Sequence, residues 1–272
     1  MDMTPLQQYA NGTYAKRDDL AAGGVGAKGR QYAKMIGAQD PGLPLVVGCA
    51  ATSAMQLYVP TMAKAFGRRA IVYTPGRKVK TAEQEFAERH GAEVHYVRPG
   101  YMSVVRKRAK DAGPCVRWVP SMATEDTAAQ VASLVGTDVS RVVVAVGSGA
   151  AAVGVLVGLH RLGLAVPVLG VFVSDMADTD MVMGRAEQVI APRDYVPYEK
   201  ETPADRYKAG MEAGQRPQFA AVQHPTAYDK GHKANLPDGT PLDPYYAAKA
   251  STYLASGDCL WVVGCRPVSL FR

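Results

Sequence analysis

The chain has 272 residues and a net charge of +6, and 47% of its residues are apolar while 21% are charged. This is the composition of a soluble globular protein, and the length allows one large domain or two small ones with a buried core. No apolar run approaches the roughly 18 residues that a membrane span needs, so no membrane association is expected. The N-terminus lacks the pattern of a secretory signal, and a cytoplasmic location is therefore expected.

The four cysteines are far apart in the sequence: Cys49, Cys115, Cys259 and Cys265. Without a CxxC pair the spacing of a zinc site is absent, and a disulfide framework is not expected. We therefore expect buried thiols and no metal site.

The basic residues are concentrated in two acid-free clusters. The first consists of Arg68, Arg69, Arg77, Lys78 and Lys80, and the second of Arg98, Arg106, Lys107, Arg108 and Lys110. Two interpretations are open. The clusters are either solvated basic faces or a surface that attracts polyanions such as nucleic acid.

Val- and Ile-rich runs alternate with segments of helical periodicity along most of the chain. Runs that are apolar at nearly every position are typical of parallel strands that are buried on both faces. The predicted strands lie within 43–50, 68–75, 92–99, 114–120, 140–149, 166–174 and 258–265. The alternation predicts an α/β architecture with right-handed crossovers.

Two of the intervening segments have clear helix signals. An apolar stripe at spacings of three or four residues predicts a helix over 52–67, in which Pro60 should produce a kink. A capping box of Thr81 and Gln84 begins a second helix over 81–91. The stretch 194–241 is rich in Pro, Tyr, Lys and Gly, which predicts long loops with short helices.

The strand Val142–Val146 is followed by a glycine turn and a segment of small residues. A helix that begins there presents free backbone N–H groups at the positive end of its dipole, which suits a phosphate. Gly147 and Gly149 would let the backbone approach the anion, and the hydroxyl of Ser148 could donate to it. The other explanation for the small residues is helix–sheet packing.

Lys28 follows a Gly-rich segment and stands at the start of a predicted helix. From there its amine could reach into a cleft, where burial or neighbouring cations would lower its pKa as Schiff-base chemistry requires. An ordinary exposed lysine is the alternative.

These segments together resemble the fold type II pyridoxal-phosphate (PLP) enzymes, the tryptophan-synthase-β-like family. The similar branch contains 1-aminocyclopropane-1-carboxylate deaminase and D-cysteine desulfhydrase. Its members begin with Lys-Arg-Glu-Asp and then Gly-Gly-Asn-Lys, whose lysine binds PLP. The counterparts in this chain are Lys16-Arg17-Asp18-Asp19 and Gly26-Ala27-Lys28, with Arg30 after them.

Three further segments match the family in its order. The segment from Val46 to Met55 resembles the family's Ser-Asn-helix segment and places Ser53 where substrate carboxylates are held. The segment Gly147–Ala151 resembles the phosphate loop. Leu242–Lys249 resembles the family's Asp-Pro-Val-Tyr segment, in which a tyrosine faces the active site.

The resemblance implies two three-layer α/β/α domains with mostly parallel sheets. Residues 1–43 and 135–272 would form the large PLP-binding domain and 44–134 the smaller α/β domain. It also implies a homodimer, because relatives are often dimers. PLP would be held by Lys28 and by the loop Gly147, Ser148, Gly149, Ala150 and Ala151.

The resemblance further implies roles for the residues around the cofactor. After a substrate amine displaces Lys28, the freed lysine becomes a general acid or base. Thr52 and Ser53 would orient the substrate carboxylate, and Tyr246 and Tyr228 would be further acids or bases, although each tyrosine could also be a packing residue.

The chain departs from the family beside the cofactor ring. The asparagine that contacts the ring oxygen matches Ala54, and the acid that contacts the pyridine nitrogen matches Ala247. The phosphate loop is also Ala-rich. These changes leave the electronic tuning of the ring unassigned.

Three hypotheses follow. The leading one is a PLP-dependent lyase or deaminase that acts on an amino acid through a Lys28 Schiff base. The second is a PLP-dependent decarboxylase or modifier of an amino acid attached to a nucleic acid base, similar to enzymes predicted in phage DNA hypermodification, and the basic clusters suggest it. The third is a binding protein that kept the PLP fold without the chemistry, which Ala54 and Ala247 suggest.

Overall fold

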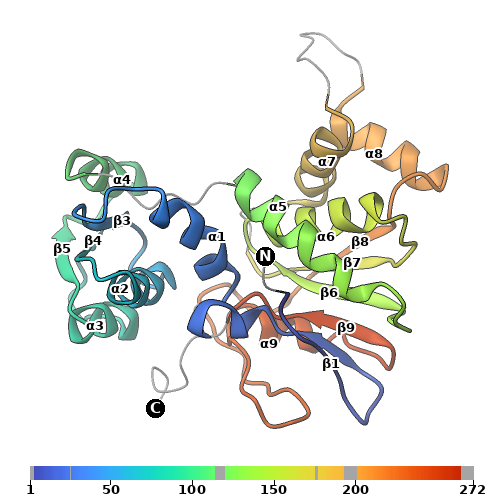
Figure 1. Cartoon of the computed structure of the whole chain (residues 1–272), viewed down its shortest axis with the longest axis horizontal. Coiled ribbons are helices and arrows are strands. Elements are labelled where there is room, and N and C mark those ends of the chain that lie inside the picture. Colours follow the sequence, from blue (N-terminus) through green and yellow to red (C-terminus); the bar gives the residue numbers. More distant parts are fainter. Residues whose placement is uncertain (1–2, 25, 114–119, 175–176, 193–200, 265–272) are drawn as a thin grey trace. The chain divides into compact units, whose positions relative to one another are not determined.

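The computed structural model describes residues 3–24, 26–113, 120–174, 177–192 and 201–264 (Figure 1). The chain forms two compact units. Among the described residues, the larger unit contains 3–21 and 120–264, and the smaller unit contains 22–113. No described helix is both long and apolar enough to cross a membrane.

The larger unit is built on a six-stranded sheet of order β1-β2-β9-β6-β7-β8. Every neighbouring pair is parallel except β1 and β2. The strands are β1 (Leu6–Gln8), β2 (Tyr14–Lys16), β6 (Arg141–Val146), β7 (Val168–Phe172), β8 (Phe219–Gln223) and β9 (Asp258–Trp261). The order reverses at β6, because β7 lies on one side of it and β9 on the other. In open α/β sheets, ligands bind outside the carboxyl ends of the strands at such a reversal.

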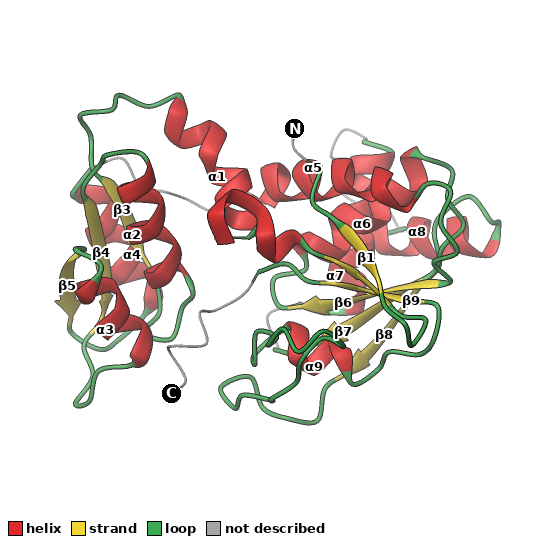
Figure 2. Cartoon of the chain, turned by 60° about the horizontal axis from the view of Figure 1, so that its bottom comes forward, coloured by secondary structure: helices red, strands yellow, loops and turns green. Residues whose placement is uncertain are grey.

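Helices cover both faces of this sheet, as Figure 2 shows. One face carries α5 (Pro120–Gln130), η2 (Val131–Leu134), α6 (Ala150–Arg161), α7 (Thr179–Ile190) and α8 (Pro203–Glu212). The other face carries α9 (Ala247–Ser251) and the loops before it, and Ala15, Val143 and Leu260 lie in this second core. The strands are therefore buried on both faces, as their apolar runs predict.

The smaller unit has a three-stranded parallel sheet of order β3-β4-β5. Its elements are α1 (Ala27–Gly37), β3 (Leu45–Gly48), α2 (Met55–Ala65), β4 (Ala70–Pro75), α3 (Ala82–Arg89), β5 (Glu93–Val97) and α4 (Met102–Asp111). Helices α1, α2 and α3 share one core with the sheet, and α4 packs on the opposite face against Val46 and Ile71. The short helix η1 (Asp18–Gly24) leads from β2 towards α1.

The predicted fold class is confirmed, because both units are three-layered and mostly parallel. Six of the predicted strands correspond to β3, β4, β5, β6, β7 and β9, while most of the segment predicted within 114–120 lies outside the described residues. The capping box of Thr81 and Gln84 is present at α3. Helix α2 continues through Pro60, and the region predicted as loops with short helices contains α8 and, beyond the prediction, the strand β8.

The two units divide at other positions than the sequence suggests. Residues 22–43 belong to the smaller unit, because Tyr32 and Ile36 of α1 lie in its core. Residues 120–134 belong to the larger unit, because α5 and η2 pack on α6.

The Lys16-Arg17-Asp18-Asp19 segment forms a buried polar network at the end of β2. The amine of Lys16 donates to Oε1 of Gln130 at 3.0 Å, and Asp18 accepts from the indole of Trp261 at 2.9 Å. Arg17 forms an ion pair with Asp19 at 2.9 Å, and the hydrogen bond to Asp19 raises the pKa of Arg17. Because buried charges need such partners, this segment has a structural role in fixing β2 to β9 and α5.

Glycines in α6 allow a close approach of α5 and η2. A Cβ at Gly154 would lie 2.5 Å from Cβ of Thr127, and one at Gly158 would lie 2.6 Å from the carbonyl oxygen of Ala128. Packing therefore explains these two glycines.

We predict that Gly158→Ala lowers the stability of the larger unit by about 2 kcal/mol, because the new methyl group would overlap backbone that has no room to move. The midpoint of urea unfolding measures this loss. Gly37→Ala is the matched control: no atom lies within 4 Å of its added Cβ, and alanine favours helix, so its midpoint should stay or rise. Equal midpoints for the two variants would contradict the packing argument.

Candidate active site

The loop after β6 forms an anion cradle at the carboxyl edge of the larger sheet. Gly149 is the N-cap of α6 and has φ +85°, a left-handed conformation that favours glycine. No side chain caps α6, so the first N–H groups of the helix are left to a ligand. Gly147 is buried, and Ser148 is half-buried.

Tyr246 lies directly against this loop. A Cβ at Gly147 would lie 2.8 Å from Cε1 of Tyr246, so only glycine leaves room for the ring. The hydroxyl of Tyr246 is 2.7 Å from that of Tyr228, and the two rings are at 77° to each other. The structure thus brings both predicted tyrosines together beside the loop.

Buried polar groups hold the segments that carry the tyrosines. Oδ1 of Asp243 accepts from the backbone N–H groups of Tyr245 and Tyr246 at 2.9 and 3.2 Å. The amine of Lys249 is fully buried and donates to the backbone carbonyls of Thr226 and Ala227 at 3.2 and 2.7 Å. Burial lowers the pKa of Lys249. Lys249 therefore holds in place the backbone of the two residues before Tyr228.

Two further polar residues lie in the larger unit: His224 follows directly after β8, and Arg185 of α7 contacts the loop after β6. Nδ1 of His224 accepts from the N–H of Thr226 at 3.1 Å, and burial, with the charge of Lys249, lowers the pKa of His224. Its imidazole is therefore mostly neutral at neutral pH. Arg185 of α7 donates to the carbonyl of Ser148 at 2.9 Å, which adds a positive charge next to the cradle.

Lys28 lies in the first turn of α1 in the smaller unit and is half-buried. Its Nζ is 5.6 Å from the centroid of the Tyr58 ring, a cation–π contact. Burial raises the pKa of the neighbouring Cys49 thiol to about 12, while a hydrogen bond with Ser53 and the charge of Lys28 act in the opposite direction. Cys49 is therefore a neutral thiol, and Lys28 and Ser53 both lie near it.

The loop before α2 presents Thr52 and Ser53, both half-buried, just before the N-terminus of that helix. Gln56 holds this loop, because its amide donates to the carbonyls of Ala50 and Ala51 at 2.9 and 2.6 Å. Thr81 also donates to Ala51 at 2.6 Å. A helix N-terminus with hydroxyl groups is a favourable place for a carboxylate.

A family model described as pyridoxal-phosphate dependent enzyme matches residues 2–230 of the chain. The chain belongs to this family. PLP is therefore the cofactor, and the sequence prediction of the family is confirmed. No curated protein matches the chain.

Several solved structures share the fold of this PLP enzyme. An ACC deaminase homologue has a TM-score of 0.67 at 19% identity, covering 97% of this chain and 90% of the other. A processed threonine deaminase isoform 2 from Solanum lycopersicum has a TM-score of 0.59 at 14% identity, with 97% and 79% covered. The O-acetylserine dependent cystathionine β-synthase from Helicobacter pylori has a TM-score of 0.56 at 15% identity, with 97% and 92% covered. They establish the type II fold.

The residues present fit PLP at its phosphate. The cradle has a glycine whose Cβ would overlap a ring, a left-handed glycine and an uncapped helix start, which together suit a bulky dianion. The two positions that match the family's contacts to the PLP ring are alanines in this chain. Ala54 is 8% exposed and Ala247 is 3% exposed, and their methyl groups offer no hydrogen bond to a ring.

The sequence predicted both groups of residues, and the structure adds the residues that position them. The smaller unit brings Lys28 and Ser53 near Cys49, and the larger unit brings Tyr228 and Tyr246 to the loop. The roles of Arg185, His224 and Gln56 were missed, because no local motif marks them. Lys249 had a signal, since it is a lone charge among the alanines of α9.

We predict that Gly147→Ala weakens PLP binding by at least about tenfold, because the added methyl group forces Tyr246 or the loop out of place. Titration of the protein with PLP, followed by fluorescence, measures the affinity. Combining it with Tyr246→Ala removes the obstacle, so the double variant should bind PLP more tightly than Gly147→Ala alone. Unchanged affinity in Gly147→Ala would show that the phosphate is held elsewhere.

Proposed function

We propose that the chain is a PLP-dependent lyase of the deaminase type that acts on a free amino acid. The observation that carries this proposal is the pair of tyrosine hydroxyls, 2.7 Å apart, beside the glycine cradle. A pair of groups that pass a proton between them, next to the place where the phosphate is held, suits elimination and deamination at an amino acid.

Lys28 would hold the cofactor through its amine. When bound, PLP withdraws electrons from the bonds at the α-carbon of the amino acid. The amine of Lys28 would then take or return the proton at the α-carbon of the substrate. When it carries a proton, the amine is attracted to the face of the Tyr58 ring, which helps to orient it.

The loop before α2 holds the substrate carboxylate. Thr52 and Ser53 donate their hydroxyls, and the dipole of α2 adds a partial positive charge. Gln56 stabilises the loop by donating hydrogen bonds to the backbone carbonyls of Ala50 and Ala51.

Tyr246 and Tyr228 would supply the proton that the leaving group takes up. One hydroxyl donates to the other, so Tyr246 can give a proton to a leaving group and recover one from Tyr228, which is half-exposed and regains its own proton from water. Lys249 and Asp243 keep the two phenols at this distance.

A second candidate function is favoured by one observation, the exposed basic face of α4. Arg106, Arg108 and Lys110 are all exposed on this helix. A substrate amino acid attached to a nucleic acid base would bring phosphates to such a face, and loss of the family's ring contacts would fit a decarboxylation. The homodimer and the cytoplasmic location expected from the sequence stay predictions.

We predict that the purified protein with PLP shows the visible absorbance band of a protonated Schiff base, and that Lys28→Ala abolishes this band. Ammonia release from amino acids with a leaving group on the β-carbon, such as serine and cysteine, should fall by about two to four orders of magnitude in the same variant. A diode-array spectrum and a coupled ammonia assay provide both readouts.

Lys64→Ala is the matched control, because Lys64 is an exposed lysine near the end of α2. It should keep the band and the activity. A protein that binds PLP and releases no ammonia, but loses carbon dioxide from a base-linked amino acid, would favour the second candidate. A protein that never takes up PLP would favour the third sequence hypothesis, a scaffold without the chemistry.

A further inference from the structure

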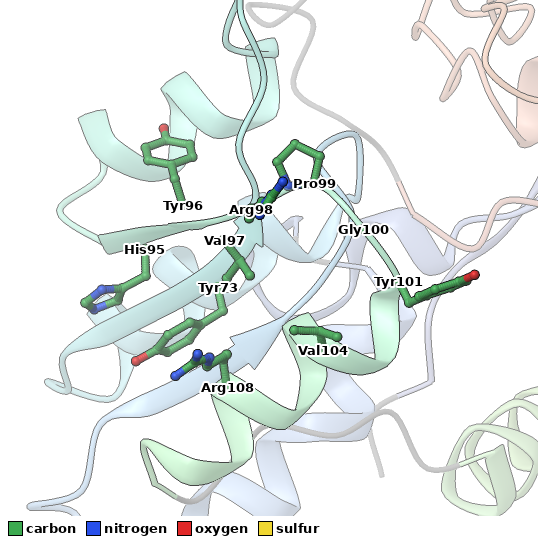
Figure 3. Close-up of a pocket in the computed structure, with 10 residues that line it drawn as sticks. All are labelled: Tyr73, His95, Tyr96, Val97, Arg98, Pro99, Gly100, Tyr101, Val104 and Arg108. Carbon is green, nitrogen blue, oxygen red and sulfur yellow. The ribbon is translucent and has the colours of Figure 1, made fainter.

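The outer face of α4 carries an open hollow that the proposed reaction does not use. It has a volume of about 560 Å³ and is lined by residues of β4, β5 and α4, among them Tyr73, His95, Arg98, Tyr101, Val104 and Arg108 (Figure 3). A second hollow of about 320 Å³ shares Val104 and Arg108 with the first. The two hollows together follow the exposed side of α4.

This face is separate from the loop that carries Ser53. Along β4, Val72 stands between Ile71 and Tyr73. Ile71 packs in the core beneath α4, whereas Val72 packs in the core that contains α2. Because successive side chains of a strand point to opposite faces, the hollow lies on the α4 face of the sheet. The helix α2 and the loop before it pack on the other face.

The hollow combines aromatic surface with positive charge. The rings of Tyr73 and His95 are stacked, with centroids 4.6 Å apart and planes at 12°. Figure 3 shows the guanidinium of Arg108 beside the ring of Tyr73, while Tyr101 points outward from the start of α4. Tyr101 is 84% exposed, so its ring is accessible to a ligand.

Charge is concentrated on the same face. Between Arg98 and Asp111 the chain has five basic residues and one acid, a net charge of +4 in a chain whose total is +6. The acid, Asp111, forms an ion pair with Lys107 at 2.8 Å, and Glu93 pairs with His95 at 2.7 Å. The remaining cations, Arg98, Arg106, Arg108 and Lys110, are exposed.

The helix is firmly placed under these side chains. Val105 and Ala109 are each 1% exposed, and a Cβ at Gly48 would lie 2.9 Å from Cα of Arg106. The close approach to β3 fixes the direction in which the arginines project.

We propose that this α4 face binds single-stranded nucleic acid. Bases stack on the aromatic rings at the hollow, and the guanidinium groups of Arg98 and Arg108 bind the phosphates of the strand. Aromatic platforms with a basic groove are the recurrent means of binding single strands, and arginine matches phosphate geometry with two parallel hydrogen bonds. A lipid surface would not reach the Tyr73–His95 stack, because these rings line a hollow instead of projecting from the protein.

The test is fluorescence anisotropy of the full chain with a labelled oligothymidylate of roughly 16 nucleotides, measured over a series of salt concentrations. The double variant Arg98→Gln, Arg108→Gln should bind roughly tenfold or more weakly at about 50 mM salt. Its plot of log affinity against log salt should be less steep by about 1.4, because each lost phosphate contact contributes about 0.7. Tyr101→Ala should weaken binding by roughly fivefold or more, whereas Tyr101→Phe keeps the ring and the affinity.

The matched control is Lys64→Gln, Arg69→Gln, which removes two exposed charges at the end of α2 and just before β4. It should bind within about twofold of the parent chain. The proposal is overturned by absence of binding at low salt, by an equal loss in the control, or by preference for a duplex of the same length. Tighter binding to phosphatidylserine vesicles at the same salt also overturns it, in favour of a membrane. Binding is read without PLP turnover, so this proposal and the proposed reaction fail independently.

Discussion

The larger unit depends on one close contact, the approach of Tyr246 to Gly147 at the end of β6. Because a Cβ at Gly147 would lie 2.8 Å from the ring, the contact permits only glycine and sets the width of the anion cradle. The same contact brings a phenol hydroxyl to the edge of the loop that begins α6. One packing constraint thus places the glycine loop and a phenol hydroxyl side by side.

The contact is maintained by buried polar groups that would be costly without partners. The fully buried amine of Lys249 donates to two backbone carbonyls, and Asp243 accepts from two backbone N–H groups. These hydrogen bonds offset the desolvation penalty of the two side chains and of the backbone groups that they bind. In the smaller unit, Gln56 stabilises the loop of Thr52 and Ser53 in the same way, by donating to two backbone carbonyls. In both groups of candidate residues, hydrogen bonds therefore hold the backbone that carries the functional side chains, as preorganised sites require.

The sequence predicts the strands that are apolar at every position, because such runs have few other structures to adopt. It misses β1 and β8, which are edge strands with exposed positions and have no continuous apolar run. It also misses β2, which has only three residues. Lys28 and the glycine loop could be predicted from their local pattern. The buried Lys16 and Lys249 could not be assigned partners, because those partners come from other segments of the chain and only the fold brings them together.

We propose that PLP is bound through the amine of Lys28. Reduction of the PLP-loaded protein with borohydride fixes the cofactor to the amine that holds it, and peptide mass mapping then finds the labelled lysine. We predict a phosphopyridoxyl group on the peptide that contains Lys28 and its loss in Lys28→Ala. A label on Lys249 or another lysine, or none at all after PLP has been taken up, would contradict the account.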